Sequence, residues 1–276
     1  SSKMQGNAAW YRAKAEEARK EGDAKQLSQA LTDLGAILLE SREFTQGMDA
    51  FEEAATLAAA LGDRHFHAQC LARKAAALDE IGRYHNAFEA MTEVLELAKA
   101  HKDLGMQCDA LIDQGQILIR SGEPVLAEET LNQALRVSHE LNSKSHLMRL
   151  LGTMGNLKVA LAALDEAAVF FDQAVALAKQ THAHQAQCGY LLNKGAVLVW
   201  QKRFDTALRV FHDALALSGE IDDPQVALTS LRYLTECYHQ IDAFDKVPVL
   251  AWRGIELAVA NHKHDLVTKF FQTLIL

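Results

Sequence analysis

Residues 191–217 read LLNKGAVLVWQKRFDTALRVFHDALAL, and this stretch decides the fold. Leu191 is followed four residues later by Gly195, and a short polar turn then leads to Ala207 and Phe211. Apolar residues spaced by three and four are typical of amphipathic helices. The stretch therefore predicts two helices joined by a turn, in which small residues on one helix leave room for large residues on the other.

The same pattern recurs every forty residues from Gly22 to Asn261, without insertion or deletion. The leucine column and the small residue four positions on are Leu31/Gly35, Leu71/Ala75, Leu111/Gly115, Leu151/Gly155, Leu191/Gly195 and Leu231/Thr235. The large apolar column of the second helix is Phe51, Met91, Leu131, Phe171 and Phe211, with Ala251 as the exception. A glycine inside a helix costs about 0.5–1 kcal/mol relative to alanine. Glycine in four of the six units therefore predicts close approach of a neighbouring helix.

The repeat boundaries carry helix stop and start residues, as in Gly62-Asp63, Asn142-Ser143 and the segment 222–224. Glycine or asparagine ends a helix in the left-handed conformation, and aspartate or serine caps the next one. Because no unit buries its apolar face alone, neighbouring units must stack. We therefore expect a single array over residues 1–276. Its expected parts are an N-terminal helix 1–21, the repeats 22–61, 62–101, 102–141, 142–181, 182–221 and 222–261, and a C-terminal helix 262–276.

The C-terminal helix is expected to place Phe271 in the leucine column. Its companion helix is absent from the sequence, so we expect either a capping helix or the first helix of a unit that continues in a longer protein.

Composition limits the classes of partner. The chain has 276 residues, 49% of them hydrophobic, and a formal net charge of −8. The negative charge argues against nucleic acid as a ligand, and no apolar stretch is long enough to insert into a membrane. Four cysteines without paired spacing, Cys70, Cys108, Cys188 and Cys237, predict reduced thiols in a cytoplasmic protein.

Candidate chemical sites are weak. The His-x-His pairs, such as His182/His184, do not share a helix face, and His184/Cys188 lacks a further ligand. Glu236-x-x-His239 has the spacing of a helical di-iron motif, but a second copy is missing. Phosphate-binding loops, dinucleotide motifs and nucleophile elbows are absent from the sequence. We therefore predict no enzyme activity, no cofactor and no metal.

These columns resemble the tetratricopeptide repeat, with Leu-x-x-x-Gly/Ala in the first helix and Ala-x-x-x-Phe-x-x-Ala in the second. The resemblance covers essentially the whole chain, although Thr235, Val247 and Ala251 depart from it in the sixth unit. The ordinary repeat has thirty-four residues, so forty implies longer helices, as in GoLoco-binding spindle adaptors, kinesin light chains and bacterial signalling proteins. The resemblance implies an all-α, right-handed superhelical solenoid of antiparallel helix pairs, whose concave wall is made by the first helices and binds peptides or proteins.

The resemblance also implies which residues face the groove. They lie two residues before the leucine column, one, two and five residues after it, and further along the same helices. The expected partner-binding residues are Gln29, Asp33, Gln69, Arg73, Asp109, Asp113, Gln116, Arg149, Asn156, Leu192, Asn193, Trp200, Arg232, Tyr233 and Glu236. The alternative for each of them is an ordinary solvated helix face.

Two local features favour binding in the fourth to sixth units. Asn156 and Asn193 fall in the columns where chaperone-binding members place paired asparagines, whose amides both donate and accept hydrogen bonds. The basic residues with which those members hold a terminal carboxylate are replaced by Gly152, Thr229 and Tyr233, which argues against a chaperone carboxylate clamp.

Apolar and aromatic side chains, namely Leu192, Trp200 and Tyr233, add typical anchor material for a binding hot spot. The first three units instead mix Asp33, Asp109 and Asp113 with Arg73, which predicts a polar and salt-sensitive surface.

The sequence therefore predicts a non-enzymatic adaptor or scaffold that binds a protein or peptide partner in its groove. The alternative is a regulatory or sensor array of a larger signalling protein, acting through self-association or control of an output domain. A structural scaffold that uses the convex face is a third reading.

Overall fold

The computed structural model describes residues 2–275, with side chains from residue 6 onward, and over this range it contains helices and no strands. Each forty-residue unit holds two helices. We call the first the A helix and the second the B helix. The predicted all-α fold of antiparallel helix pairs is confirmed.

The chain divides into two compact units, unit 1 (Ser1–His146) and unit 2 (Leu147–Leu276), with the division inside α8. The helices before the division are α1 (Ser2–Glu21), α2 (Ala24–Glu40), α3 (Phe44–Ala60), α4 (Arg64–Glu80), α5 (Tyr84–Ala100), α6 (Leu104–Arg120) and α7 (Pro124–Leu141). The division crosses α8 (Lys144–Ala160). The later helices are α9 (Leu164–Gln180), α10 (His184–Trp200), α11 (Phe204–Glu220), α12 (Pro224–Gln240), η1 (Phe244–Lys246), α13 (Val247–Ala260) and α14 (His264–Ile275). The single array over 1–276 stays a prediction.

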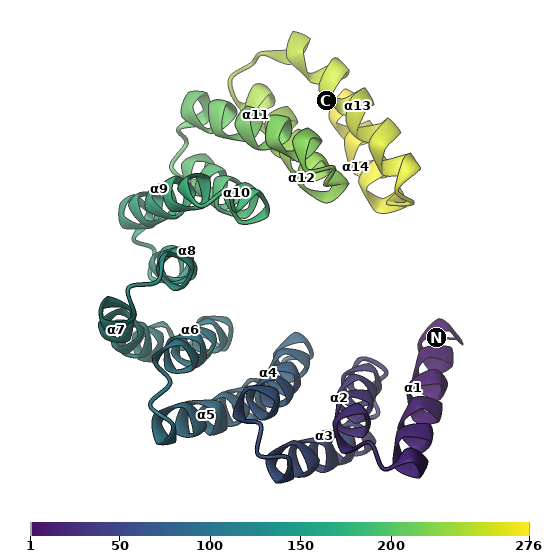
Figure 1. Cartoon of the computed structure of the whole chain (residues 1–276). Helices are drawn as coiled ribbons and strands as arrows, with labels where there is room; N and C mark the ends of the chain where they lie inside the picture. The colour runs from purple at the N-terminus through teal and green to yellow at the C-terminus, as the bar shows by residue number, and fades with distance from the viewer. Residues whose placement is uncertain (1, 276) are drawn as a thin grey trace. The chain divides into compact units, whose positions relative to one another are not determined.

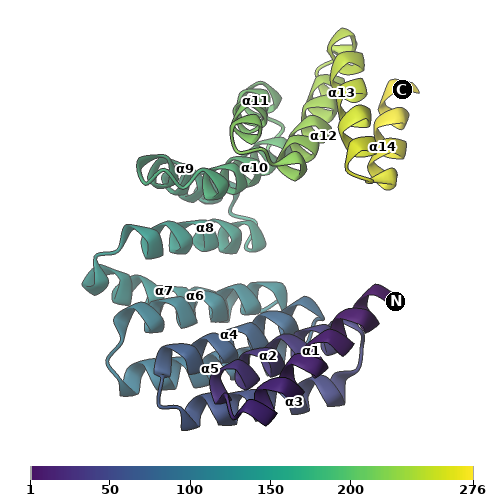
Figure 2. The same ribbon diagram turned by 45° about the vertical axis from the view of Figure 1, so that its right-hand side comes forward.

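Within each unit, helices that follow one another in the sequence pack as antiparallel neighbours (Figures 1 and 2). A helices of successive repeats also touch, as α2 and α4 do in unit 1 and α10 and α12 do in unit 2. At these places, and between α12 and α14, neighbouring A helices therefore lie side by side.

The glycine column seats large side chains of the B helices. A Cβ atom added at Gly35 would lie 3.0 Å from the ring of Phe51, and one at Gly155 would lie 2.6 Å from Cε1 of Phe171. Real Cβ atoms are not found at the shorter distance, so an alanine there would force the ring or the helix to move. The predicted close approach of A and B helices is confirmed.

The last helix corrects one prediction. Phe270, at 1% exposure, is the buried residue of α14, whereas Phe271, which we expected in the buried leucine column, is 42% exposed. The ring of Phe270 packs on Gly254 of α13. The sixth unit has Thr235 and Ala251 at the glycine and aromatic positions, and its glycine–ring contact is instead between Gly254 of α13 and Phe270 of α14.

The helix ends repeat with half the period of the sequence pattern. A residue with positive φ follows a helix every twenty residues: Gly22, Arg42, Gly62, Gly82, Lys102, Gly122, Asn142, Ala162, His182, Lys202, Asp222, Asp242 and His262. At most of these turns the next residue donates its N–H to a carbonyl five positions back, as Glu43 does to Leu38 at 2.8 Å. This is the Schellman arrangement, which satisfies the last carbonyls of a helix.

Aspartates then cap four of the A helices. The carboxylates of Asp23, Asp63, Asp103 and Asp223 accept the backbone N–H three residues further on. Such a cap satisfies one of the unpaired donors at a helix start. The predicted caps at Asp63 and Asp223 are confirmed.

Candidate functional site

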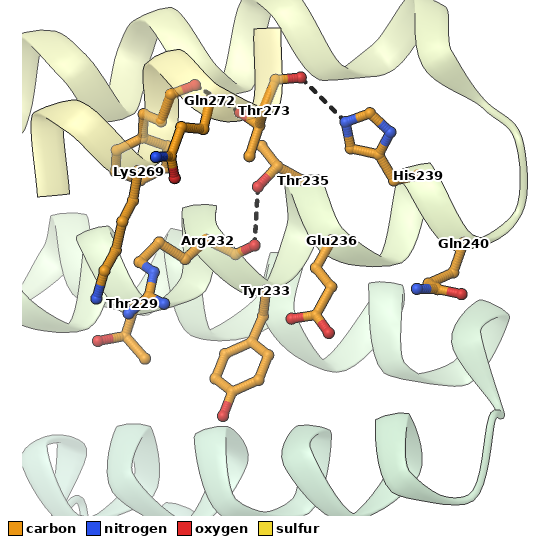
Figure 3. Close-up of a pocket in the computed structure, with 11 residues that line it drawn as sticks. Thr229, Arg232, Tyr233, Thr235, Glu236, His239, Gln240, Lys269, Gln272 and Thr273 are labelled. Carbon is orange, nitrogen blue, oxygen red and sulfur yellow. Dashed lines mark hydrogen bonds between the residues drawn. The ribbon is translucent and has the colours of Figure 1, made fainter. Parts of the chain in front are cut away.

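A pocket of unit 2 lies between α12 and α14 and has a volume of about 550 Å³ (Figure 3). Three of the predicted groove residues, Arg232, Tyr233 and Glu236, line it together. They project from the same A helix, and α14 supplies the opposite wall. The structure thus gathers these three side chains at one cavity.

Tyr233 forms an aromatic wall of the pocket, and a second aromatic ring packs against it. Its ring stacks on that of Phe211, with centroids 4.5 Å apart and planes inclined by 5°. Phe211 is itself fully buried on Gly195. Tyr233 is therefore half-buried, and packing fixes the position of its ring.

One end of the pocket carries two cationic groups. Figure 3 shows the Lys269 ammonium from α14 and the Arg232 guanidinium from α12 gathered beside Thr229. Glu236 lies one helical turn after Arg232, but no ion pair links it to either cation. Positive and negative side chains are thus both present in the pocket and remain separate.

The other end of the pocket is closed by a hydrogen bond between the helices. Nε2 of His239 lies 3.0 Å from the carbonyl oxygen of Thr273. A carbonyl oxygen only accepts, so this nitrogen carries the proton and donates it. The bond ties α12 to α14, and the ring of Phe244 packs against the same histidine at 5.5 Å.

Unit 1 has a smaller pocket between α1 and α2, of about 260 Å³. It brings Gln29 and Asp33 together with Tyr11 and Lys14. Burial raises the pKa of the Asp33 carboxyl, and the charges of Arg73 and Lys14 oppose that shift. Asp33 therefore lies within electrostatic reach of Arg73, which sequence analysis placed in the same groove.

A third pocket, of about 150 Å³, joins Asp113 and Gln116 of α6 to residues of α4. The side chain of Asp79 is 9% exposed and forms an ion pair with Arg120 beside this pocket. The other carboxylate oxygen of Asp79, Oδ1, has no hydrogen-bond partner among the described residues. The lining of this pocket is mixed: it combines these charged and amide side chains with alanine, methionine and isoleucine side chains.

The remaining predicted groove residues do not line these three pockets. They are Gln69, Arg73, Asp109, Arg149, Asn156, Leu192, Asn193 and Trp200. Asn156 and Asn193 are exposed on unit 2, and Trp200 is 57% exposed at the last residue of α10. Leu192 instead packs against the core of unit 2, so it contributes more to the core than to an open surface.

Two of the charged groove residues have neighbours in the structure. Oδ1 of Asp109 lies 3.4 Å from Nε2 of His146 within unit 1. In unit 2, burial raises the pKa of Tyr190, and the charge of Arg149 opposes the shift. The sequence columns did not predict either contact.

The predicted groove columns ended with the sixth repeat and did not include α14. Lys269 and Gln272 of α14 line the unit 2 pocket and fall forty residues after Thr229 and Arg232. Extending the groove columns by one more period would have found both. Tyr11 and Lys14 lie on α1, outside the repeated columns, and no sequence signal pointed to them.

Three other features bear on possible chemistry: metal ligands, cysteines and membrane-spanning helices. Over residues 6–275, no group of three His, Cys, Asp or Glu side chains is arranged to hold a metal ion. The four cysteines are buried and are not joined in disulfides, and burial raises the pKa of the Cys237 thiol to about 11. In the part of the chain that the structure describes, no helix has the length and apolar character that a bilayer crossing requires.

Comparison with known proteins points to one family. The tetratricopeptide repeat family model matches residues 68–101. Human mitochondrial tetratricopeptide repeat protein 19 is 30% identical over 140 residues, which is 50% of this chain and 36% of that protein. The chain thus matches little more than a third of the length of this curated relative.

Solved structures share the fold at low sequence identity. A signal transduction ATPase with a tetratricopeptide repeat sensor from Pyrococcus horikoshii has a TM-score of 0.70 and 10% identity, covering 98% of this chain and 43% of that one. A Rap protein complexed with competence and sporulation factor has a TM-score of 0.62 and 13% identity, covering 99% and 85%. These similarities concern the fold alone.

Proposed function

We propose that the chain is an array of tetratricopeptide repeats and acts as a non-enzymatic adaptor that binds a peptide or helix of a partner protein on its A-helix surface. The residues proposed to anchor the partner in unit 2 are Asn156, Asn193, Tyr233 and, at the edge of α10, Trp200.

The observation that carries the proposal is the pocket between α12 and α14. Predicted groove residues from one A helix line a cavity of about 550 Å³ beside an aromatic ring held by stacking. Binding pockets typically combine such apolar walls with a few placed polar groups. A rigid aromatic side chain loses little conformational entropy on binding.

The exposed amides add a means of holding a peptide backbone. Asn156 and Asn193 are open to solvent on the same unit. Each amide offers a donor and an acceptor, so it satisfies the N–H and C=O groups of an extended chain without reading its side chains. The Rap protein with this fold was solved with a bound factor, which supports partner binding on such a scaffold.

The test begins with selection of binders from a random peptide library displayed on phage. Selected peptides are then titrated against Asn156→Ala, Asn193→Ala and Tyr233→Ala. We expect each variant to weaken binding by about tenfold, the typical effect of truncating a contributing contact. The matched control is Gln173→Ala, on an exposed face of the B helix α9. Binding that persists unchanged in all three variants contradicts the proposed surface, provided their thermal stability matches the parent.

A second candidate function is a sensor or regulatory array that acts through self-association. Exposed apolar side chains on α13 and α14 favour it: Trp252, at 50% exposure, packs edge-to-face on Phe271 with centroids 5.5 Å apart. Contiguous exposed apolar surface often marks an interaction site. A mass that rises with concentration in light scattering, and falls back in Trp252→Ser, supports this candidate. A constant monomer mass rejects it.

A further inference from the structure

The cationic end of the unit 2 pocket has no built-in counter-charge. Arg232 and Lys269 come from two different helices and line the same cavity. Neither forms an ion pair with a carboxylate of the described residues, and the acidic lining residue, Glu236, remains apart from both. Two like charges at one end of a pocket repel each other, and a bound carboxylate would relieve that repulsion while accepting charge-assisted hydrogen bonds.

The walls beside these cations are aromatic and fixed. Tyr233 stacks on Phe211, and Phe270 is buried on Gly254 with 1% exposure. Because packing holds both rings, the cavity does not need to be ordered when a ligand enters, which favours binding. A ligand therefore meets a positive end next to an apolar wall.

The opposite part of the pocket has a different charge. Glu236 lies toward the end closed by His239 and Gln240, away from the two cations (Figure 3). A second carboxylate on the ligand would meet Glu236 and be repelled. The lining thus favours a ligand with one negative group at one end and a neutral or basic group at the other.

We propose that this pocket binds the carboxylate of an acidic side chain, Asp or Glu, in the partner segment, with an adjacent apolar residue against Tyr233 and Phe270. Arg232 and Lys269 hold the carboxylate, and Glu236 sets the direction of the segment. The inference rests on the proposed adaptor function and names the chemistry that its partner must carry. The positions differ from those of a clamp for terminal carboxylates, where this chain has Gly152, Thr229 and Tyr233.

The probe is N-acetyl-Glu-Leu-amide, titrated into the 15N-labelled full chain and followed by NMR. We expect saturable, weak binding, with shift changes confined to residues of α12 and α14. N-acetyl-Gln-Leu-amide, which lacks the charge, should bind at least about tenfold more weakly, because hydrogen bonds to charged groups are about twice as strong as neutral ones.

Variants assign the contact. Arg232→Gln and Lys269→Gln should each weaken binding of the Glu dipeptide by about tenfold, and the double variant should abolish it. The matched control is Arg253→Gln, which removes an exposed charge of α13 outside the pocket and should leave binding unchanged. Equal binding of the Glu and Gln dipeptides, or binding that survives the double variant, overturns the inference.

Further probes separate the sources of a carboxylate. N-acetyl-Leu, with a free terminal carboxylate, and inorganic phosphate should both bind more weakly than the Glu dipeptide. If either binds as tightly, the assignment to an acidic side chain is wrong.

Binding of the selected phage peptides distinguishes the proposed adaptor function from the proposed site for an acidic side chain. Peptides that depend on Asn156 and Asn193 but bind equally well to the Arg232→Gln/Lys269→Gln variant leave the adaptor function standing and remove the acidic anchor. Dipeptide binding that follows the charge variants, with no peptide selected at all, supports the anion site and removes the wider groove.

Discussion

The two compact units differ in where they place glycine. In unit 1, four of the left-handed residues that end helices are glycines, namely Gly22, Gly62, Gly82 and Gly122. In unit 2, the corresponding residues through His262 are Ala162, His182, Lys202, Asp222, Asp242 and His262, with no glycine at these positions. The turns nevertheless repeat the same backbone hydrogen bonds, as in Arg83 to Leu78 at 2.8 Å and Ala163 to Lys158 at 2.8 Å.

Unit 1 has one such glycine under an aromatic ring of a paired helix, Gly35 under Phe51, whereas unit 2 has several. Gly152, Gly155, Gly195 and Gly254 lie under the rings of Tyr190, Phe171, Phe211 and Phe270. We infer from the comparison that packing of the paired helices holds the turns at Ala162 and Lys202, since alanine and lysine have no intrinsic preference for the left-handed conformation. A left-handed residue with a side chain costs roughly 1–2 kcal/mol.

The largest expected effect is at the ring seats. Gly155→Ala should lower the free energy of unfolding by about 1–3 kcal/mol, the usual cost of overpacking. Gly35→Ala in unit 1 should cost less, because the added Cβ would be 3.0 Å from the ring rather than 2.6 Å. Urea denaturation followed by circular dichroism measures both.

Gly189→Ala is the control for the ring seats. This glycine is exposed within α10, and nothing lies within 4 Å of an added Cβ. The substitution should stabilise the protein by up to about 1 kcal/mol through helix propensity alone. A loss at Gly189 equal to that at Gly155 would contradict the steric explanation.

Substitutions at the left-handed turn residues should have the next largest effect on stability. Gly122→Ala in unit 1 should destabilise by about 1 kcal/mol, and Ala162→Gly in unit 2 should stabilise by somewhat less, because glycine also gains entropy when unfolded. Thermal denaturation of the two variants checks the opposite signs. Two changes of the same sign would mean that the units do not differ in how their turns are held.

The cap at Asp223 provides a pH-dependent comparison. The hydrogen bond from Gln185, at 2.6 Å, and the backbone N–H groups of Val226 and Gln225 lower the pKa of this carboxyl. Its stabilisation is present above the unfolded pKa of about 3.9 and is lost as pH falls through the lower folded value. Asp223→Ala should cost about 1 kcal/mol at pH 7, as for other caps. The cost should shrink in strongly acidic urea titrations, and a pH-independent cost would refute the linkage.

Asp33 in unit 1 should behave in the opposite way and with the smallest effect. Burial raises the pKa of its carboxyl, so the ionised form is disfavoured in the folded state. The penalty is full above the folded pKa and disappears below the unfolded value. Asp33→Asn should therefore stabilise unit 1 slightly at pH 7 and make no difference below about pH 3. Destabilisation at pH 7 would show that attraction to Arg73 and Lys14 outweighs burial.

Much of the fold was predictable because it follows from periodic apolar spacing. The helix pairs, the glycine seats at Gly35 and Gly195, and the caps at Asp63 and Asp223 each have a local sequence signal. The half-period of left-handed turns was missed, since residues such as Ala162 and Lys202 give no sequence signal for positive φ.

The candidate site was only partly predictable. Arg232, Tyr233 and Glu236 fall in repeated columns, so the sequence placed them on one helix face. The cavity also needs α14, to which the groove columns were not extended. Stacking of Tyr233 on Phe211 depends on three-dimensional packing that no spacing rule encodes.

The twenty-residue spacing of the turns has a consequence for how such a chain tolerates duplication and loss. Excising forty residues between equivalent turns, for example from Gly62 to His101, rejoins an A helix to the B helix before it and preserves every role. Excising twenty residues would keep the same turn geometry but would place two A helices or two B helices in succession. The glycines of an A helix would then have no B-helix ring to pack on. The left-handed turns repeat every twenty residues, whereas the pattern of core side chains repeats every forty residues. Gain or loss of a whole helix pair therefore preserves both patterns, and gain or loss of a single helix preserves only the first.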